Sequence, residues 1–177
     1  MKFTVVCPKN LEKVQKYSCA MDRSLKERIQ FLPSPETAAV STPAEADLLI
    51  VFGEKDPVGD NSICGFDAGD TADLKAKITV ACGEDITGDI RCGLGSDCDL
   101  TFSSLQKNRL QICLLHPVRC LNGHLCEPFE FAFRGSVGNA YPLLAAAAIK
   151  ILCSVRETGY HLQTTTVRRT QRRKLPE

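Results

Sequence analysis

The stretch Asp47-Leu48-Leu49-Ile50-Val51-Phe52 decides the fold class of this chain. After Asp47, the residues are apolar at both alternating sets of positions, so neither face of an extended strand would be polar. Such a run is typical of a central strand in a parallel sheet that is covered on both faces. Gly53 follows directly. We therefore predict a buried central strand at residues 47–52.

The residues before this run predict a strand and a helix. Residues 3–7 form a short β-prone run. Apolar side chains then recur at three- to four-residue spacing over residues 11–32, which predicts an amphipathic helix that Asn10 caps and Pro33 stops. A break near residues 22–24 would divide it into two helices. A strand, a helix and a buried strand in this order favour right-handed crossovers and a largely parallel sheet.

Downstream of the central strand, alternating apolar residues predict more strands, and an Ala-rich segment predicts a helix at residues 140–157 with Gly159 at its C-terminal cap. Cys113 falls in one of the strands, and we expect its side chain to point into the core. The β-prone residues 160–167 predict an extra C-terminal edge strand. The other predicted strands are 37–41, 77–82, 100–103, 109–115 and 128–134.

These elements predict an α/β fold with three layers and a largely parallel sheet, either Rossmann-like or flavodoxin-like. A chain of 177 residues is long enough for one independent core. We assign residues 1–167 to a single α/β domain and residues 168–177 to a basic, mobile tail.

The composition is that of an ordinary globular protein, and it does not indicate a particular binding partner. Hydrophobic residues make up 44% and charged residues 24%, which is ordinary for a globular domain, and the net charge is +1. The longest apolar stretch is well short of the roughly 20 residues that a membrane-spanning helix needs. The N-terminal residues do not resemble a signal peptide. We therefore expect a cytoplasmic protein with reduced cysteines and no membrane partner.

Ten cysteines are the unusual feature of the composition, and segment 113–126 concentrates thiol and imidazole groups. Such groups are the ligands of zinc and of iron-sulfur clusters. We predict Cys120, His124 and Cys126 as ligands, with His116 or a cysteine of segment 92–98 as the fourth. The alternative is an ordinary loop in a cysteine-rich chain. The predicted donors of the segment are Cys113, His116, Cys120, His124 and Cys126.

A glycine-containing turn precedes the Ala-rich helix and predicts a site for a small anion. Backbone N–H groups at a helix N-terminus favour phosphate or carboxylate groups. The alternative is that the glycines only form the turn and that Ser136 or Asn139 caps the helix. The loops at residues 7–10, 53–56 and 82–83 would share this carboxyl edge of the sheet. The predicted ligand-binding residues are Arg134, Gly135, Ser136, Gly138 and Asn139.

Two further features complete the candidates. Acidic loops could hold a divalent cation or act as acids and bases, with Glu54 and Asp56 as first choices, although such residues are more often solvated. Clustered arginines in the tail could bind nucleic acid.

We predict binding of a small anionic ligand at the carboxyl edge of the sheet. The alternatives are a metal-binding or redox-sensing module on segment 113–126, and a nucleic-acid accessory protein. Whether the chain is an enzyme stays open.

Overall fold

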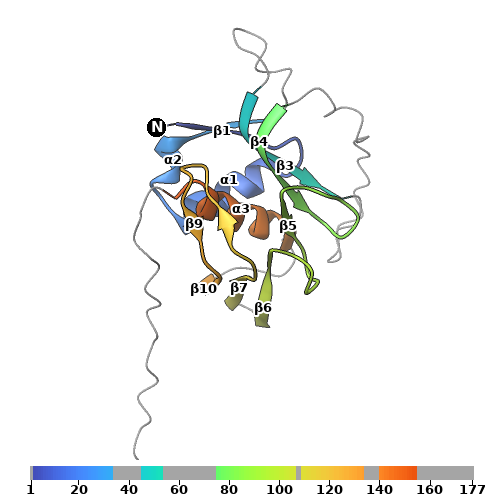
Figure 1. Cartoon of the computed structure of the whole chain (residues 1–177). Helices are drawn as coiled ribbons and strands as arrows, with labels where there is room; N and C mark the ends of the chain where they lie inside the picture. Colours follow the sequence, from blue (N-terminus) through green and yellow to red (C-terminus); the bar gives the residue numbers. More distant parts are fainter. Residues whose placement is uncertain (1, 34–44, 54–74, 107–108, 134–139, 155–177) are drawn as a thin grey trace, which may run out of the picture.

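The computed structural model describes residues 2–33, 45–53, 75–106, 109–133 and 140–154. Within these ranges the chain forms a large sheet, a small hairpin and three helices (Figure 1). The helices are α1 (Leu11–Met21), α2 (Leu25–Arg28) and α3 (Ala140–Leu152). The strands are β1 (Phe3–Val6), β2 (Ile29–Leu32), β3 (Glu45–Phe52), β4 (Lys75–Cys82), β5 (Ile90–Cys92), β6 (Leu100–Gln106), β7 (Arg109–Leu114), β8 (Val118–Arg119), β9 (Leu125–Cys126) and β10 (Phe129–Phe133).

Eight of these strands form one mixed sheet in the order β10-β7-β6-β5-β4-β3-β1-β2. The pairs from β2 to β6 are all parallel, whereas β7 runs antiparallel to β6 and β10 antiparallel to β7. Strands β8 and β9 pair with each other as a separate antiparallel hairpin. The predicted α/β fold with a largely parallel sheet is therefore confirmed.

Strand β3 confirms the prediction for residues 47–52, since it lies between β1 and β4 in the sheet. Leu48 and Ile50 are completely buried on one face, and Leu49 is 5% exposed on the other. Apolar residues at both alternating sets of positions are what a strand with two buried faces requires.

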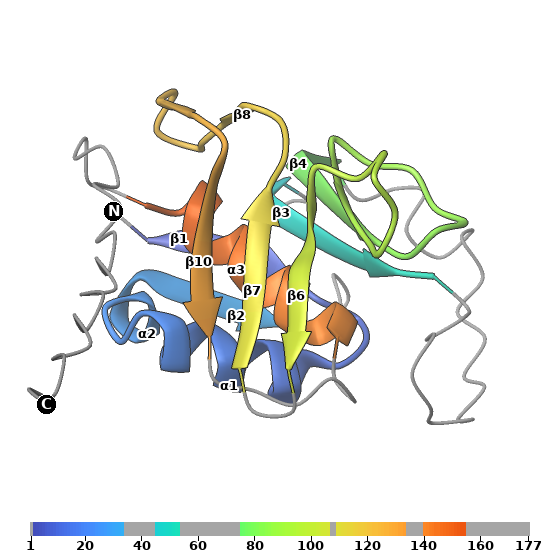
Figure 2. The ribbon, with the colours of Figure 1, turned by 90° about the horizontal axis from the view of Figure 1, so that it is seen from below.

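Helix α3 forms the centre of the core, and every one of its residues except Lys150 is buried. The sheet curves around this helix, with β10, β7 and β6 on one side of it and β3 and β4 on another (Figures 1 and 2). A helix that is apolar all round is stable only when it is surrounded in this way. The observed helix ends at Leu152, short of the predicted end at residue 157. The predicted Gly159 cap lies outside the described residues.

The segment 11–32 has the break near residues 22–24 that was the alternative to one long helix, but its last four residues form a strand. Asp22 is extended at the end of α1, and its carboxylate accepts hydrogen bonds from the backbone N–H and the hydroxyl of Ser24. After the single turn of α2, residues Ile29–Leu32 pair in parallel with β1 as strand β2. The apolar spacing alone could not separate these states, because pairing with β1 is a tertiary contact.

The third layer of the predicted fold is not seen in the described part of the chain. Core residues of all three helices belong to one hydrophobic cluster with the same face of the sheet, among them Val14, Leu25 and Leu144. A second, smaller cluster around Val6 and Leu49 contains strand residues only. The predicted strands at 37–41 and 160–167 and the predicted tail at 168–177 lie outside the described residues. None of the helices in the described ranges is long and apolar enough to cross a membrane.

Candidate functional site

One row of paired residues marks the edge of the sheet at which a site is expected. Phe52 pairs with Cys82, Cys82 with Cys92, Cys92 with Leu100, and Leu100 with Leu114. Strands β3, β4 and β5 end at this row, while antiparallel β7 also ends there and β6 begins there. We call this row and the loops that leave it the carboxyl edge. Open parallel sheets bind ligands beyond this edge.

Three glycines follow the row and continue the pattern of backbone hydrogen bonds. Gly53 donates to the Cys82 carbonyl at 3.0 Å, Gly83 to the Cys92 carbonyl at 3.0 Å, and Gly93 to the Leu100 carbonyl at 3.1 Å. A Cβ atom on Gly83 would come within 3.2 Å of the Gly53 backbone. These glycines therefore allow close strand packing, and their N–H groups are already used within the sheet.

Buried thiols lie at the same edge. Cys7, Cys82 and Cys92 are completely buried. Burial raises the pKa of Cys7 to about 12 and raises the pKa of Cys82 well above its ordinary value. Thiols in this state are protonated and behave as small apolar side chains. Cys7 and Cys82 accordingly pack as core side chains.

The prediction that Cys113 points into the core is wrong. Its neighbours on β7, Ile112 and Leu114, are buried, whereas Cys113 is only partly buried. Because side chains alternate along a strand, Cys113 must point to the opposite face. There it faces Glu130, whose nearby charge adds to the effect of burial in raising the pKa of Cys113.

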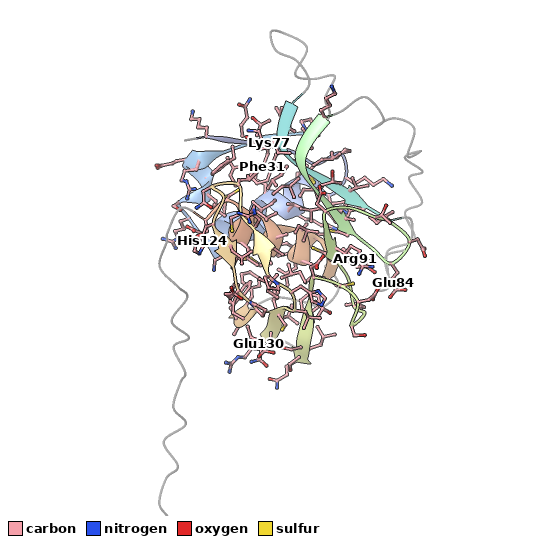
Figure 3. The ribbon with its side chains drawn as sticks, viewed as in Figure 1. Phe31, Lys77, Glu84, Arg91, His124 and Glu130 are labelled. Carbon is pink, nitrogen blue, oxygen red and sulfur yellow. The ribbon has the colours of Figure 1, made fainter. Side chains whose placement is uncertain are left out.

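The predicted metal ligands are distributed over two places. Cys120 and Cys126 lie in the hairpin of β8 and β9 and are 5% and 7% exposed, but His124 at its tip is exposed to solvent. His116 instead pairs with Asp99, whose carboxylate binds the backbone of Arg91. Arg91 and His124 lie on opposite sides of the molecule in Figure 3. Within the described residues, no three His, Cys, Asp or Glu side chains form a group that could hold a metal ion.

The hairpin instead supplies hydrogen-bond donors to the C-terminal end of α3. The Cys120 thiol donates to the Ile151 carbonyl at 3.2 Å, and the Leu121 N–H donates to the Leu152 carbonyl at 3.0 Å. The Asn122 side chain donates to the Ser154 carbonyl at 3.0 Å. The last carbonyls of a helix lack partners within the helix, so these donors satisfy groups that would otherwise be orphaned in the core.

A guanidinium completes this cap. Arg28, at the end of α2, donates from Nη2 to the Cys153 carbonyl at 2.5 Å, and its guanidinium lies 5.6 Å from the centre of the Phe3 ring. A positive charge at a helix C-terminus is favourable because the helix dipole is negative there. Burial also raises the pKa of Cys120 to about 11. In the absence of other ligands, burial favours the protonated form of the Cys120 thiol, which is the form that donates to Ile151.

An aspartate and a histidine meet beside the row, on its amino side, where Asp99 is level with Arg91. The Nδ1 atom of His116 lies 3.1 Å from Oδ1 of Asp99, and the two side chains are 54% and 22% exposed. The other carboxylate oxygen of Asp99 accepts the Arg91 N–H at 2.8 Å. The Asp99 backbone N–H donates to the Arg91 carbonyl, and its carbonyl accepts the Leu115 N–H, both at 2.8 Å. The carboxylate is therefore held in place, and it orients the imidazole.

The first strand–helix turn reaches the carboxyl edge of the sheet. Asn10 precedes α1 with a φ of 56°, and among the described residues it is the only one other than glycine with a positive φ. Its side chain makes no capping hydrogen bond to the helix. Lys9 lies beside it, and the Cys7 thiol donates to the Lys9 carbonyl at 2.9 Å. The first turn of α1 is thus left without the side-chain cap that we predicted from Asn10.

The predicted ligand-binding turn lies outside the described residues. This applies to Arg134, Gly135, Ser136, Gly138 and Asn139, and also to Glu54 and Asp56. The structure describes only the ends of the elements that this turn joins, Phe133 of β10 and Ala140 of α3. Phe129 of β10 pairs with Leu114, the last residue of the row. Phe133 is four residues further along β10, so it lies about 13 Å from the row.

Sequence patterns do not indicate the Asp99–His116 pair. No local spacing signals the contact, because the two residues are 17 positions apart and meet only through the pairing of β6 with β7. Comparisons with protein-family models, with curated proteins and with solved structures found no match.

Proposed function

We propose that this protein binds a small ligand with a phosphate or carboxylate group at the carboxyl edge of its sheet. We also propose that the fold is three-layered and Rossmann-like or flavodoxin-like, because such folds bind ligands at that edge. The edge gathers the ends of β1, β3, β4 and β5, which all run in parallel.

The observation that carries the proposal is the uncapped first turn of α1. Backbone N–H groups at the start of a helix have no partner within the helix and carry a partial positive charge. Asn10 adopts a left-handed conformation there, and its side chain makes no capping hydrogen bond. Non-glycine residues in this conformation are uncommon and are more frequent at functional sites.

One charge near the turn favours an anion and another opposes it. Lys9 is partly buried beside Asn10 and supplies a positive charge. Glu12 in the first turn is negative and exposed, so it competes with an incoming anion. We propose that the segment with Arg134, Gly135, Ser136, Gly138 and Asn139, which leads into α3, provides the second half of the site.

The two alternatives receive less support from the described residues. For the metal-binding alternative, Cys120 is used as a hydrogen-bond donor, and no three possible ligands among the described residues form a group. The nucleic-acid alternative depends on the arginine-rich tail, which lies outside the described residues. We therefore retain anion binding as the function to test first.

The test is thermal unfolding in inorganic phosphate and in ADP, each against sodium chloride at equal ionic strength. A ligand that binds only the folded state raises its stability by RT ln(1 + [L]/Kd). We expect a rise in Tm for the wild type that is lost in Lys9→Ala and kept in Lys16→Ala, an exposed lysine further along α1. Glu12→Gln should increase the rise.

Two results would count against the proposal. If neither phosphate nor ADP raises the Tm of the wild type, the proposal is wrong. If the rise persists in Lys9→Ala but is lost in Arg134→Ala, the anion is bound by the turn before α3 and not by the turn before α1.

A further inference from the structure

The outer face of the sheet, by which we mean the face opposite the three helices, is apolar around β1 and β3. Val6 and Leu49 pair with each other on these strands and are 2% and 5% exposed. In the described part of the chain, the apolar residues that pack around them all belong to strands. Neighbours in the same sheet flank such side chains but do not cover their ends. The outer face therefore needs a cover that the described strands do not supply.

The direction of each chain connection indicates which face it crosses. From β1 to β2 the chain moves toward one edge of the sheet, and α1 and α2 of this connection lie on the inner face. From β2 the chain moves the other way, to β3, β4, β5 and β6 in turn. Connections between parallel strands of one sheet are right-handed in about 98% of cases. Reversing the direction moves a right-handed connection to the opposite face, so the later connections are expected on the outer face.

The described connection between β4 and β5 follows this rule. A Cβ atom on Gly88, just before β5, would lie 3.0 Å from the Cβ atom of Ala81. Ala81 pairs with Val51, which is two residues beyond Leu49 on the same strand. Because side chains alternate along a strand, Ala81 shares the outer face with Leu49 and Val51. The chain between β4 and β5 therefore packs on the outer face, as a right-handed crossover requires.

The connection from β3 to β4 has to return along the length of both strands. Strand β3 ends at Phe52, whereas β4 begins at Lys75, which pairs with Glu45 at the start of β3. The return covers seven residues of strand, or about 23 Å. Residues 54–74 are about three times as many as an extended chain needs for that distance. The segment is thus long enough both to cross the face and to cover it.

We propose that residues 54–74 lie across the outer face between β3 and β4 and cover Leu49 and Val51, as the third layer of the fold. Contact with apolar side chains of the segment would remove the ends of Leu49 and Val51 from water, which is favourable. The large apolar residues of the segment are Val58, Ile63, Phe66 and Leu74.

The same rule separates this segment from the other parts of the chain that could reach the outer face. Residues 34–44 connect β2 to β3 and pass over β1, which lies between these strands, whereas Val51 lies beside β4. Residues 155–177 follow α3, which packs on the inner face. The proposal extends the proposed three-layer fold. Its failure would leave the test of anion binding unaffected, since that test concerns Lys9 and the turn before α1.

The first experiment measures nuclear Overhauser effects from the methyl groups of Leu49 and Val51 in the ¹³C-labelled full chain. We expect effects to protons of residues 54–74. A sample mixed from labelled and unlabelled chains separates contacts within one chain from contacts between two copies. The proposal is overturned if the effects lead only to residues 34–44 or 155–177, arise only between copies, or do not extend beyond the sheet.

The second experiment is a double-mutant cycle in urea denaturation. Its background variant carries Val58→Ser, Ile63→Ser and Phe66→Ser. We expect Leu49→Val to lower the midpoint less in this background than in the wild type, because the contacts of Leu49 with its cover are already lost.

The matched control for this cycle is Ile50→Val. Ile50 is the next residue of β3 but is completely buried on the inner face, so its substitution should lower the midpoint equally in both backgrounds. Equal effects of Leu49→Val in the two backgrounds would overturn the proposal. If the background variant does not fold, the Overhauser effects of the wild type decide.

Discussion

The Sγ atom of Cys120 lies 3.2 Å from the carbonyl oxygen of Ile151, although the two residues are 31 positions apart. Cys120 is nearly buried, and its thiol proton points to the last turn of α3. A residue that sequence spacing indicated as a metal ligand is therefore part of a helix cap. The β8–β9 hairpin supports the core helix and is not an independent module.

Loss of the thiol donor should weaken this cap. We expect Cys120→Ala to lower the free energy of unfolding by about 1–2 kcal/mol, because a buried carbonyl loses its partner and a small cavity is left. Urea denaturation followed by circular dichroism measures the change. Cys19→Ala, on the partly exposed face of α1, is the control and should change stability by less than about 0.5 kcal/mol. Equal effects of the two substitutions would contradict the role of Cys120.

Removal of Arg28 should have a larger effect. Its guanidinium makes a charge-assisted hydrogen bond to the Cys153 carbonyl and also covers the Phe3 ring. We expect Arg28→Ala to cost about 2–3 kcal/mol in urea denaturation. Lys26→Ala, at an exposed position of the same helix, should be close to neutral. A small effect of Arg28→Ala would show that water replaces the guanidinium at the end of α3.

Two glycines with positive φ provide a matched pair. Gly83 has a φ of 149° and its Cβ would meet the Gly53 backbone at 3.2 Å, whereas Gly123 has a φ of 83° with nothing within 4 Å. Gly123→Ala should cost about 1–2 kcal/mol from backbone strain alone. Gly83→Ala should cost clearly more, since strands β3 and β4 would have to separate. Thermal unfolding of both variants measures the difference, and similar values would show that the carboxyl edge can relax.

Stability should fall at alkaline pH because of the buried thiols. Burial raises the pKa of Cys7 from 9.0 to about 12, so the folded protein keeps a proton that the unfolded chain releases. The stabilisation is fully present below pH 9, and it is lost progressively as pH rises from about 9 toward about 12.

Urea denaturation at a series of pH values between neutrality and pH 11 tests this dependence. In Cys7→Ala the decrease in stability with pH should be less steep than in the wild type, since one of the contributing thiols is gone. Identical slopes would mean that Cys7 does not retain its proton in the folded protein.

Local patterns predicted the elements that are buried on all sides. Strand β3 and helix α3 were predicted because their residues are apolar almost without interruption. Strand β5 was missed, since Ile90–Cys92 is too short for an alternating pattern to be recognised. Strand β2 was assigned to a helix, because four residues with apolar ends fit either period.

The candidate site was predictable only in part. The sequence predicted a parallel sheet whose strands share a carboxyl edge, and the described strands do end together at one row of residues. It could not indicate that His116 faces Asp99 or that Cys120 faces Ile151, since both contacts depend on how distant segments are aligned.

The amino-acid sequence by itself determined that this chain forms an α/β domain around an apolar strand and an apolar helix, because burial of such segments is favourable whatever surrounds them. Only the tertiary structure decided the roles of the polar residues and thiols. Hydrogen bonds are short and directional, so a donor and an acceptor are matched only when strand register and helix position bring them within about 3 Å. For that reason the same cysteines and histidines were compatible with a metal site in the sequence and form a helix cap and an imidazole–carboxylate pair in the fold.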